Sequence, residues 1–287
     1  MKKHPEYKTN PFFIAGESYG GIMIVEFAKQ LHEAIKSGNI SMNFKGVALG
    51  DSWISSMNFM NDYGEYLFAQ SLIDEQQLAQ VNKLAEKCQQ LVNNSLWVNA
   101  TTCRKEMVDL VGMLTGGVSW YNVLKRGIDD GSSLSYAQMK TISILECPLK
   151  ELYELVVSLD LDKPLDDYMN TVIREKLGVI PEHVQYQAQK GFVYSSLAGD
   201  IMKPVYSTVD KLLDYGIHVT VYNGQLDLIC HTPGVHKWMN RLQWSGMSQF
   251  KNATKIPFET TNHPLAGFTK TYKNLQLIYV LRSGHLV

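Results

Sequence analysis

The sequence contains no apolar run that approaches the ~18 residues needed to cross a membrane. It has no excess of charge either: the formal net charge at pH 7 is −1, so electrostatics point to no nucleic-acid or bilayer partner. The first residues are polar and form no secretory signal peptide, and there is no internal repeat. What is present, 45% apolar and 19% charged residues, is typical of a globular chain with one large α/β domain or two smaller ones.

The four cysteines fit no zinc spacing, and we expect neither a bound metal nor a cofactor. If one disulfide forms, Cys88–Cys103 is the most plausible pair, and it would suit an oxidising compartment. The alternative is that all four are separate buried thiols. Four sequons for N-glycosylation favour the secretory route, and their asparagines are Asn39, Asn93, Asn99 and Asn252.

A strand–turn–helix pattern stands near the start of the chain. Residues 12–15 are an apolar run that predicts a buried strand, and residues 22–35 read as a helix. Between them, Gly16-Glu17-Ser18-Tyr19-Gly20 fits the pattern G-x-S-x-G. The flanking glycines would allow a sharp turn, with the serine on a strained backbone and the N–H groups of residues 18 and 19 facing the helix start. We interpret Ser18 as a nucleophile; a simple glycine-rich turn is the alternative.

The rest of the chain alternates between sheet and helical patterns. We assign residues 1–57 to the first part of a hydrolase-like core, residues 58–200 to a helical lid insertion, and residues 201–287 to the second part of the core. Expected strands are 44–50, 217–222 and 274–281, and expected helices are 74–92, 103–114, 135–159, 202–215 and 232–242. The sequence thus predicts an α/β fold with a doubly wound, mostly parallel sheet.

A nucleophilic serine needs a base and a carboxylate that orients the base. In doubly wound hydrolases these follow later strands in the order Ser, Asp, His. Asp227 follows the strand at 217–222 and His285 follows the strand at 274–281, so we predict the triad Ser18, Asp227 and His285. Asp51, which follows the strand at 44–50, is the second choice of acid. The other histidines are less well placed; His263, for example, is expected in a loop with no strand before it.

Three motifs of this chain together resemble the signature blocks of the serine carboxypeptidases. They are Gly-Glu-Ser-Tyr-Gly-Gly at 16–21, Asn-Gly-Gln-Leu-Asp-Leu-Ile-Cys at 223–230 and Gly-His-Leu-Val at 284–287. The resemblance implies an α/β-hydrolase fold and a peptidase that releases C-terminal amino acids from peptides or proteins through an acyl-enzyme. It also implies that the Tyr19 backbone N–H binds the oxyanion, that Glu17 binds the substrate's terminal carboxylate, and that Cys230 lies near the site.

The chain departs from the family pattern at both ends. Members carry strands before the nucleophile, including an Asn-Gly-Gly-Pro-Gly segment with a second oxyanion donor, and they continue beyond the catalytic histidine. We therefore expect a piece of a longer secreted or lysosomal protein, truncated at both ends, with N-terminal strands missing and the nucleophile strand at a sheet edge. Two alternatives follow: a catalytically silent fragment that lacks the oxyanion segment, or an acyltransferase or esterase of the same family.

Overall fold

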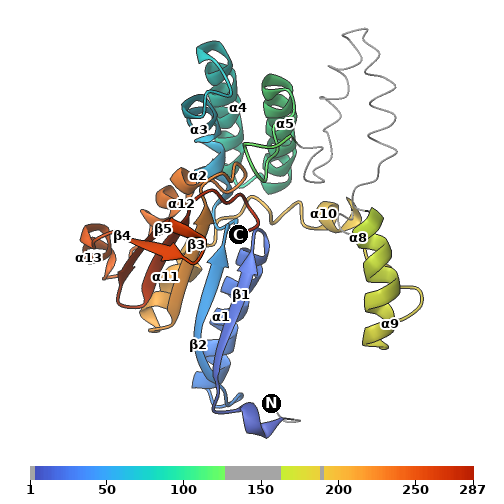
Figure 1. Ribbon diagram of the computed structural model, residues 1–287, viewed down its shortest axis with the longest axis vertical. Helices are drawn as coiled ribbons and strands as arrows, with labels where there is room; N and C mark the ends of the chain where they lie inside the picture. The colour runs from blue at the N-terminus through green and yellow to red at the C-terminus, as the bar shows by residue number, and fades with distance from the viewer. Residues whose placement is uncertain (1–3, 127–162, 188–190) are drawn as a thin grey trace.

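The computed structural model describes residues 4–126, 163–187 and 191–287, and its centre is a mixed sheet (Figure 1). Within the described residues, six strands pair in the order β1-β2-β3-β6-β5-β4. The first four of these run parallel, and the last two add antiparallel. Their bounds are β1 Pro11–Glu17, β2 Asn43–Gly50, β3 His218–Gly224, β4 Ile256–Thr260, β5 His263–Tyr272 and β6 Leu275–Val280.

The parallel part of the sheet is the part that the sequence predicted, and its strands are the apolar, β-branched runs. As expected, β1 lies at an edge, with β2 as its neighbour in the described residues. The prediction that the strand at residues 12–15 is buried is wrong, because no residue of β1 is buried and Phe13 is 60% exposed. The hairpin of β4 and β5 was not predicted. Its side chains are mostly exposed, so it lacks the buried apolar run that marks a parallel strand. The prediction that no strand precedes His263 is therefore wrong, because β4 precedes it and His263 begins β5.

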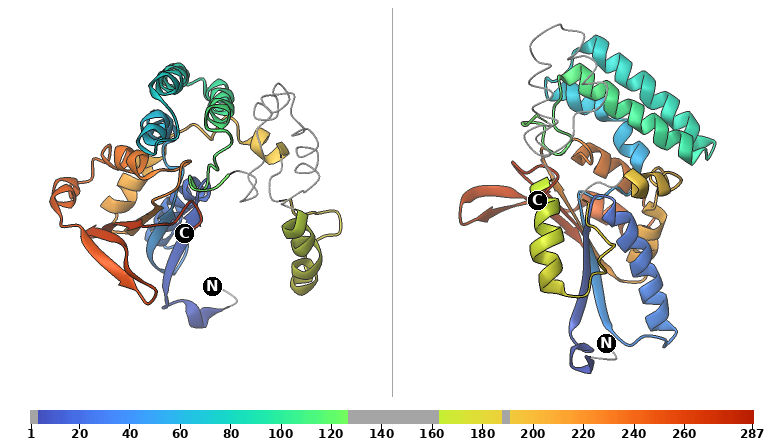
Figure 2. Two further views of the ribbon diagram at one scale, coloured as in Figure 1. Left: turned by 45° about the horizontal axis from the view of Figure 1, so that its top comes forward. Right: turned by 90° about the vertical axis from the view of Figure 1, so that its right-hand side faces the viewer.

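Helices cover the sheet and rise above the carboxyl ends of its parallel strands (Figure 2). Helix α1 (Gly20–Lys36) packs on β1 and β2 and contacts α11 (Tyr206–Asp214), which packs on β3. The others near the sheet are α2 Ser56–Met60, α3 Tyr63–Ala69, α12 Thr232–Met239 and α13 Met247–Asn252, with a 3-10 turn η1 at Pro5–Tyr7. The predicted helices at 202–215 and 232–242 are thus shorter than expected.

Two long helices, α4 (Glu75–Asn93) and α5 (Trp97–Thr115), lie side by side above the sheet (Figure 1). Helix α4 begins at Asp74, whose carboxylate accepts the Gln77 N–H at 2.8 Å in a capping box. The predicted disulfide is present: Cys88 of α4 is bonded to Cys103 of α5. Because a disulfide at this point fixes one helix against the other, the residues next to it have defined positions.

The remaining described elements are short. They are α8 Lys163–Tyr168, the π-helical turn η2 Met169–Ile173, α9 Arg174–Leu177 and α10 Gly191–Ser196. The predicted helix at 135–159 and Cys147 lie outside the described residues. Among the helices that are described, none combines the length and the apolar character that a membrane span requires.

Candidate active site

The nucleophile candidate sits on the turn between β1 and α1. Ser18 has a φ of +56°, so the predicted strained backbone is present. Its N–H donates to the Gly50 carbonyl at 3.0 Å, and its own carbonyl accepts the Trp53 N–H at 2.9 Å. These two bonds tie the turn to the end of β2. They also correct one expectation, because the Ser18 N–H is used in this pairing and does not face the helix start.

The close approach at this turn is at the third glycine of the motif rather than the second. A Cβ on Gly20 would meet no atom within 4 Å, whereas a Cβ on Gly21 would overlap the side chain of Ser52. At Gly16 a Cβ would lie 3.1 Å from Ile24 Cγ2, which is tight but adjustable. The crossing of α1 over the end of β2 therefore depends on Gly21.

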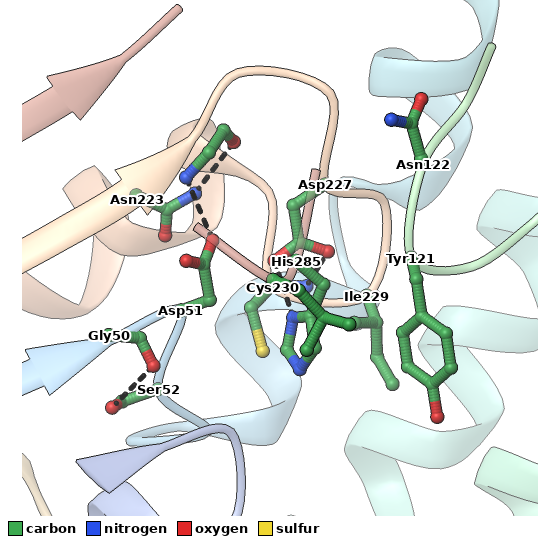
Figure 3. Close-up of polar contacts among 12 residues, drawn as sticks. Gly50, Asp51, Ser52, Tyr121, Asn122, Asn223, Asp227, Ile229, Cys230 and His285 are labelled. Atoms are coloured by element: carbon green, nitrogen blue, oxygen red, sulfur yellow. Dashed lines mark hydrogen bonds and ion pairs between the residues drawn. The ribbon is translucent and has the colours of Figure 1, made fainter. Parts of the chain in front are cut away.

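The predicted acid and base meet as a buried pair (Figure 3). His285 Nδ1 lies 2.8 Å from Asp227 Oδ2, and the two residues are 3% and 0% exposed. The other oxygen, Asp227 Oδ1, accepts the Cys230 N–H at 3.1 Å. The carboxylate is thus held by the backbone and fixes the tautomer of the imidazole, which leaves Nε2 as the nitrogen available for proton transfer.

Two backbone contacts place the loop that carries His285. The His285 N–H donates to the Tyr121 carbonyl at 2.7 Å, and the two rings stack with centroids 5.3 Å apart. A Cβ on Gly224 would overlap the carbonyl oxygen of Gly284, so the loops after β3 and β6 touch at a point where only glycine fits. Tyr121 was not predicted, since nothing in its local sequence indicates this contact.

Ser18 and the Asp227–His285 pair all lie at the same end of the sheet, where the parallel strands β1, β3 and β6 have their carboxyl ends. Ser18 is half-buried, and its hydroxyl forms no hydrogen bond to His285 in the described structure. Hydrogen bonds between catalytic groups are often long without substrate and tighten when substrate binds. The joining of all three side chains therefore stays a prediction.

Tyr19, whose backbone N–H is the predicted oxyanion donor, follows Ser18 directly. Among the described residues, no acceptor meets the backbone N–H of Tyr19, which precedes α1. The Tyr19 hydroxyl donates to Asp200 Oδ2 at 2.8 Å, and burial together with this bond raises the pKa of Tyr19 to about 12. The side chain is therefore a neutral donor to Asp200, and its backbone N–H points to no partner of its own.

A second carboxyl, Asp51, is buried beside the pair. It is 0% exposed, its φ is +38°, and its Oδ1 accepts the Gly224 N–H at 2.8 Å, while its Oδ2 has no donor. Burial, together with the charge of Asp227, raises the pKa of Asp51 to about 9. Because two adjacent buried carboxylates repel, Asp51 holds the proton and donates to Asp227, which stays the charged partner of His285.

Burial also shapes the other titrating groups. It lowers the pKa of His285. Burial raises the pKa of Asp227, and the charge of Glu17 adds to this increase. Glu17 itself is half-buried at the end of β1. Its contact with a substrate carboxylate stays a prediction.

Cys230 is a buried free thiol near the predicted site. Ligand atoms of Asp227, Cys230 and His285 all lie within 4.8 Å of one another, a spacing that could hold a metal ion. Metal binding requires the thiolate, but burial raises the pKa of the Cys230 thiol. The donor set therefore suits the Asp227–His285 hydrogen bond better than a metal.

Ser18 opens onto a cavity of about 520 Å³. Most of its walls are apolar or aromatic, and the described lining residues are Ser18, Tyr19, Trp53, Arg104, Gln187, Gly191, Val193, Tyr194, Leu197, Ile201 and Ile229. Glu17 is not among them. A cavity of this size next to a strained serine can accept a side chain of a peptide.

The parallel sheet, the serine turn and the later acid and base loops define the α/β-hydrolase fold. A solved structure agrees: Kex1Δp, titled a prohormone-processing carboxypeptidase from Saccharomyces cerevisiae, matches with a TM-score of 0.75 at 22% identity, over 100% of this chain and 60% of its own. The family model of the serine carboxypeptidases matches residues 1–287, and the chain belongs to that family.

Curated relatives give the same result. Retinoid-inducible serine carboxypeptidase from Mus musculus is 38% identical over 99% of this chain and 62% of its own length. The Rattus norvegicus protein of that name is 39% identical with the same coverage, and serine carboxypeptidase-like 51 of Arabidopsis thaliana is 36% identical over 100% of this chain and 63% of its own. The chain thus spans a little over three-fifths of the length of these relatives.

Proposed function

We propose that the protein is a serine-type carboxypeptidase that releases the C-terminal amino acid of peptides through an acyl-enzyme. The observation that carries this proposal is the buried Asp227–His285 pair, in which Asp227 Oδ2 and His285 Nδ1 are 2.8 Å apart. The pair lies at the carboxyl end of the parallel strands, where Ser18 occupies a strained turn. Family membership supports it. An imidazole already oriented by Asp227 supports the proposal, because activation of a serine hydroxyl requires an oriented base.

The reaction follows from the available atoms. Ser18 Oγ attacks the carbonyl carbon of the last peptide bond, and its proton passes to His285 Nε2. The tetrahedral oxyanion accepts a hydrogen bond from the Tyr19 N–H. When the C–N bond breaks, the His285 proton goes to the leaving amine, and the C-terminal amino acid departs. Water then cleaves the Ser18 ester by the same proton transfers and restores the hydroxyl.

Glu17 is proposed to bind the substrate's terminal carboxylate. It is the last residue of β1 and precedes the nucleophile, and its charge adds to the effect of burial in raising the pKa of Asp227. A carboxylic acid can donate a hydrogen bond to a carboxylate only when it is protonated. We therefore expect discrimination between free-acid and amidated peptides to fall in Glu17→Ala.

The helical region at residues 58–200 is proposed to act as the lid over this site. Arg104 of α5 and Val193 of α10 line the cavity together with Ser18. A lid that supplies the cavity wall can select substrates without altering the catalytic groups.

We also propose that the protein enters the secretory route. The Cys88–Cys103 disulfide supports this, since disulfides persist in oxidising compartments. The asparagines of all four sequons are exposed, namely Asn39, Asn93, Asn99 and Asn252. A shift in gel mobility after endoglycosidase treatment of the protein from its native source would support glycosylation at these sites.

The test uses a fluorophosphonate probe and a pair of peptides that differ in a free or an amidated C-terminus. Wild type and the control Ser37→Ala, at the exposed end of α1, should be labelled, and Ser18→Ala should not. Wild type should cleave the free-acid peptide and should not cleave the amidated peptide. Absence of labelling at Ser18 contradicts the proposal. Equal turnover of both peptides would contradict a carboxypeptidase, and turnover of simple esters without peptide cleavage would identify an esterase or acyltransferase instead.

A further inference from the structure

Among the described residues that line the cavity beside Ser18, Arg104 is the cation. Arg104 lies on α5, directly after Cys103, whose disulfide to Cys88 fixes this helix against α4. The Arg104 guanidinium carbon lies 4.9 Å from the centre of the Trp53 ring, and Trp53 is itself 4% exposed. The disulfide fixes the backbone next to Arg104, and the packed ring of Trp53 supports the guanidinium.

Arg104 has no anionic partner in the described part of the chain. It forms no ion pair there, and its Nε is buried without an acceptor. Burying a charged donor without a partner is unfavourable, and stacking on an aromatic ring offsets only part of the loss. A guanidinium held in this state has its planar fork available for a carboxylate from outside the chain.

The rest of the cavity wall limits what that carboxylate can belong to. Among its described lining residues there is no other Lys or Arg, and no Asp, Glu or His. Arg104 stacks on Trp53, and most of the other described lining residues, Leu197 and Ile201 among them, are apolar or aromatic. Apolar walls suit a methylene stem, and they strengthen an ion pair by excluding water. This combination fits the side chain of a glutamate.

We propose that Arg104 gives this enzyme a preference for peptides with an acidic side chain next to the scissile bond. The inference rests on the proposed carboxypeptidase function and adds a substrate class to it. The terminal α-carboxylate is assigned to Glu17, which lies outside the cavity lining, so the cavity is free for a side chain. That side chain belongs either to the terminal residue or to the penultimate one, and both supply the same carboxylate.

The experiment compares kcat/KM for two pairs of blocked peptides, above pH 5 so that glutamate is ionised. One pair ends in Ala-Glu or Ala-Gln, and the other ends in Glu-Ala or Gln-Ala. Wild type should favour glutamate over glutamine in one pair by about tenfold or more, as expected for a hydrogen bond to a charged group. Arg104→Leu should bring that ratio to about one, and Arg104→Lys should keep part of it.

The control is Arg241→Leu, because the guanidinium of Arg241 also stacks on a ring, that of Tyr206 at 4.6 Å, but lies outside the cavity. For Arg241→Leu, the ratio of kcat/KM between glutamate and glutamine peptides should equal that of wild type. A wild-type ratio near one in both pairs would overturn the proposal. So would an equal loss of kcat/KM on all four peptides in Arg104→Leu, since that would assign Arg104 to the α-carboxylate or to folding.

Binding separates this inference from the proposed function. Calorimetry with Ser18→Ala measures the affinity for each peptide without turnover. A glutamate preference in binding that Arg104→Leu abolishes supports the inference even if wild type cleaves nothing, in which case only the proposed function fails. If the enzyme neither cleaves nor binds glutamate peptides better than glutamine peptides, the proposed role of Arg104 is refuted while the carboxypeptidase function is retained.

Discussion

Asp51→Asn should stabilise the protein at neutral pH while leaving its site intact. In the folded protein Asp51 holds a proton at pH 7, because burial raises its pKa from 3.8 to about 9. In the unfolded chain the same carboxyl is ionised above its ordinary pKa of 3.8. Folding at pH 7 must therefore take up a proton, and this uptake opposes folding. An asparagine has no proton to take up.

The size of the effect follows from the two pKa values. The folded state binds more protons than the unfolded state between about pH 4 and pH 9, so the wild-type stability falls as pH rises through this window. The ordinary pKa of 3.8 lies about three units below pH 7, and each unit corresponds to about 1.4 kcal/mol. The gain in free energy of unfolding therefore has an upper limit of about 4 kcal/mol. The advantage of Asp51→Asn should grow from near zero at pH 4 toward this limit.

The asparagine can keep both contacts of the protonated acid. Its Oδ1 can accept the Gly224 N–H, now 2.8 Å from Asp51 Oδ1, and its Nδ2 can donate to Asp227. Asparagine also tolerates the positive φ of +38° at this position. Peptidase activity should therefore stay within a few-fold of wild type. Asp51→Ala is the contrasting variant, because it leaves the Gly224 N–H unpaired, at about 1–3 kcal/mol, and strains the backbone.

The assay is urea unfolding of both variants and wild type at a series of pH values from 4 to 8. The reasoning is refuted if the stability difference between Asp51→Asn and wild type is independent of pH, or if it decreases as pH rises. A pH-independent difference would mean that Asp51 is ionised in the folded protein. Asp227 would then carry the proton, and the assignment of the charged partner of His285 would have to be reversed.

Three more predictions concern the loops, the disulfide and the base. Gly224→Ala should abolish peptidase activity, because its Cβ would push away the loop that carries His285, while Gly20→Ala, with open space at its Cβ, should retain the fold by circular dichroism. Replacing Cys88 and Cys103 with alanine should lower the free energy of unfolding by about 3 kcal/mol, the value expected for a loop of 15 residues, and denaturant titration measures it. Because burial lowers the pKa of His285, kcat/KM should fall in acid with a midpoint below 6.5, and a midpoint above 6.5 would contradict this.

Local sequence was sufficient for the parts of the fold that depend on neighbours in the chain. The strand–turn–helix around Ser18, the helix that begins at Asp74 and the parallel strands could be predicted because backbone sterics, capping and apolar runs act over a few residues. The β4–β5 hairpin could not, because exposed antiparallel strands carry no comparable pattern. Asp51 was a candidate acid from its place after a strand, but its burial beside Asp227 and its raised pKa depend on the tertiary structure.

The sequence by itself determined which side chains follow which strands, and thus the order of Ser18, Asp227 and His285 along one sheet edge. Only the tertiary structure decided that Tyr121 holds the loop of His285 and that Arg104 turns its charge into the cavity beside Ser18. Such contacts join residues far apart in the chain. Their geometry depends on how helices and strands pack together, and no local pattern of residues encodes it.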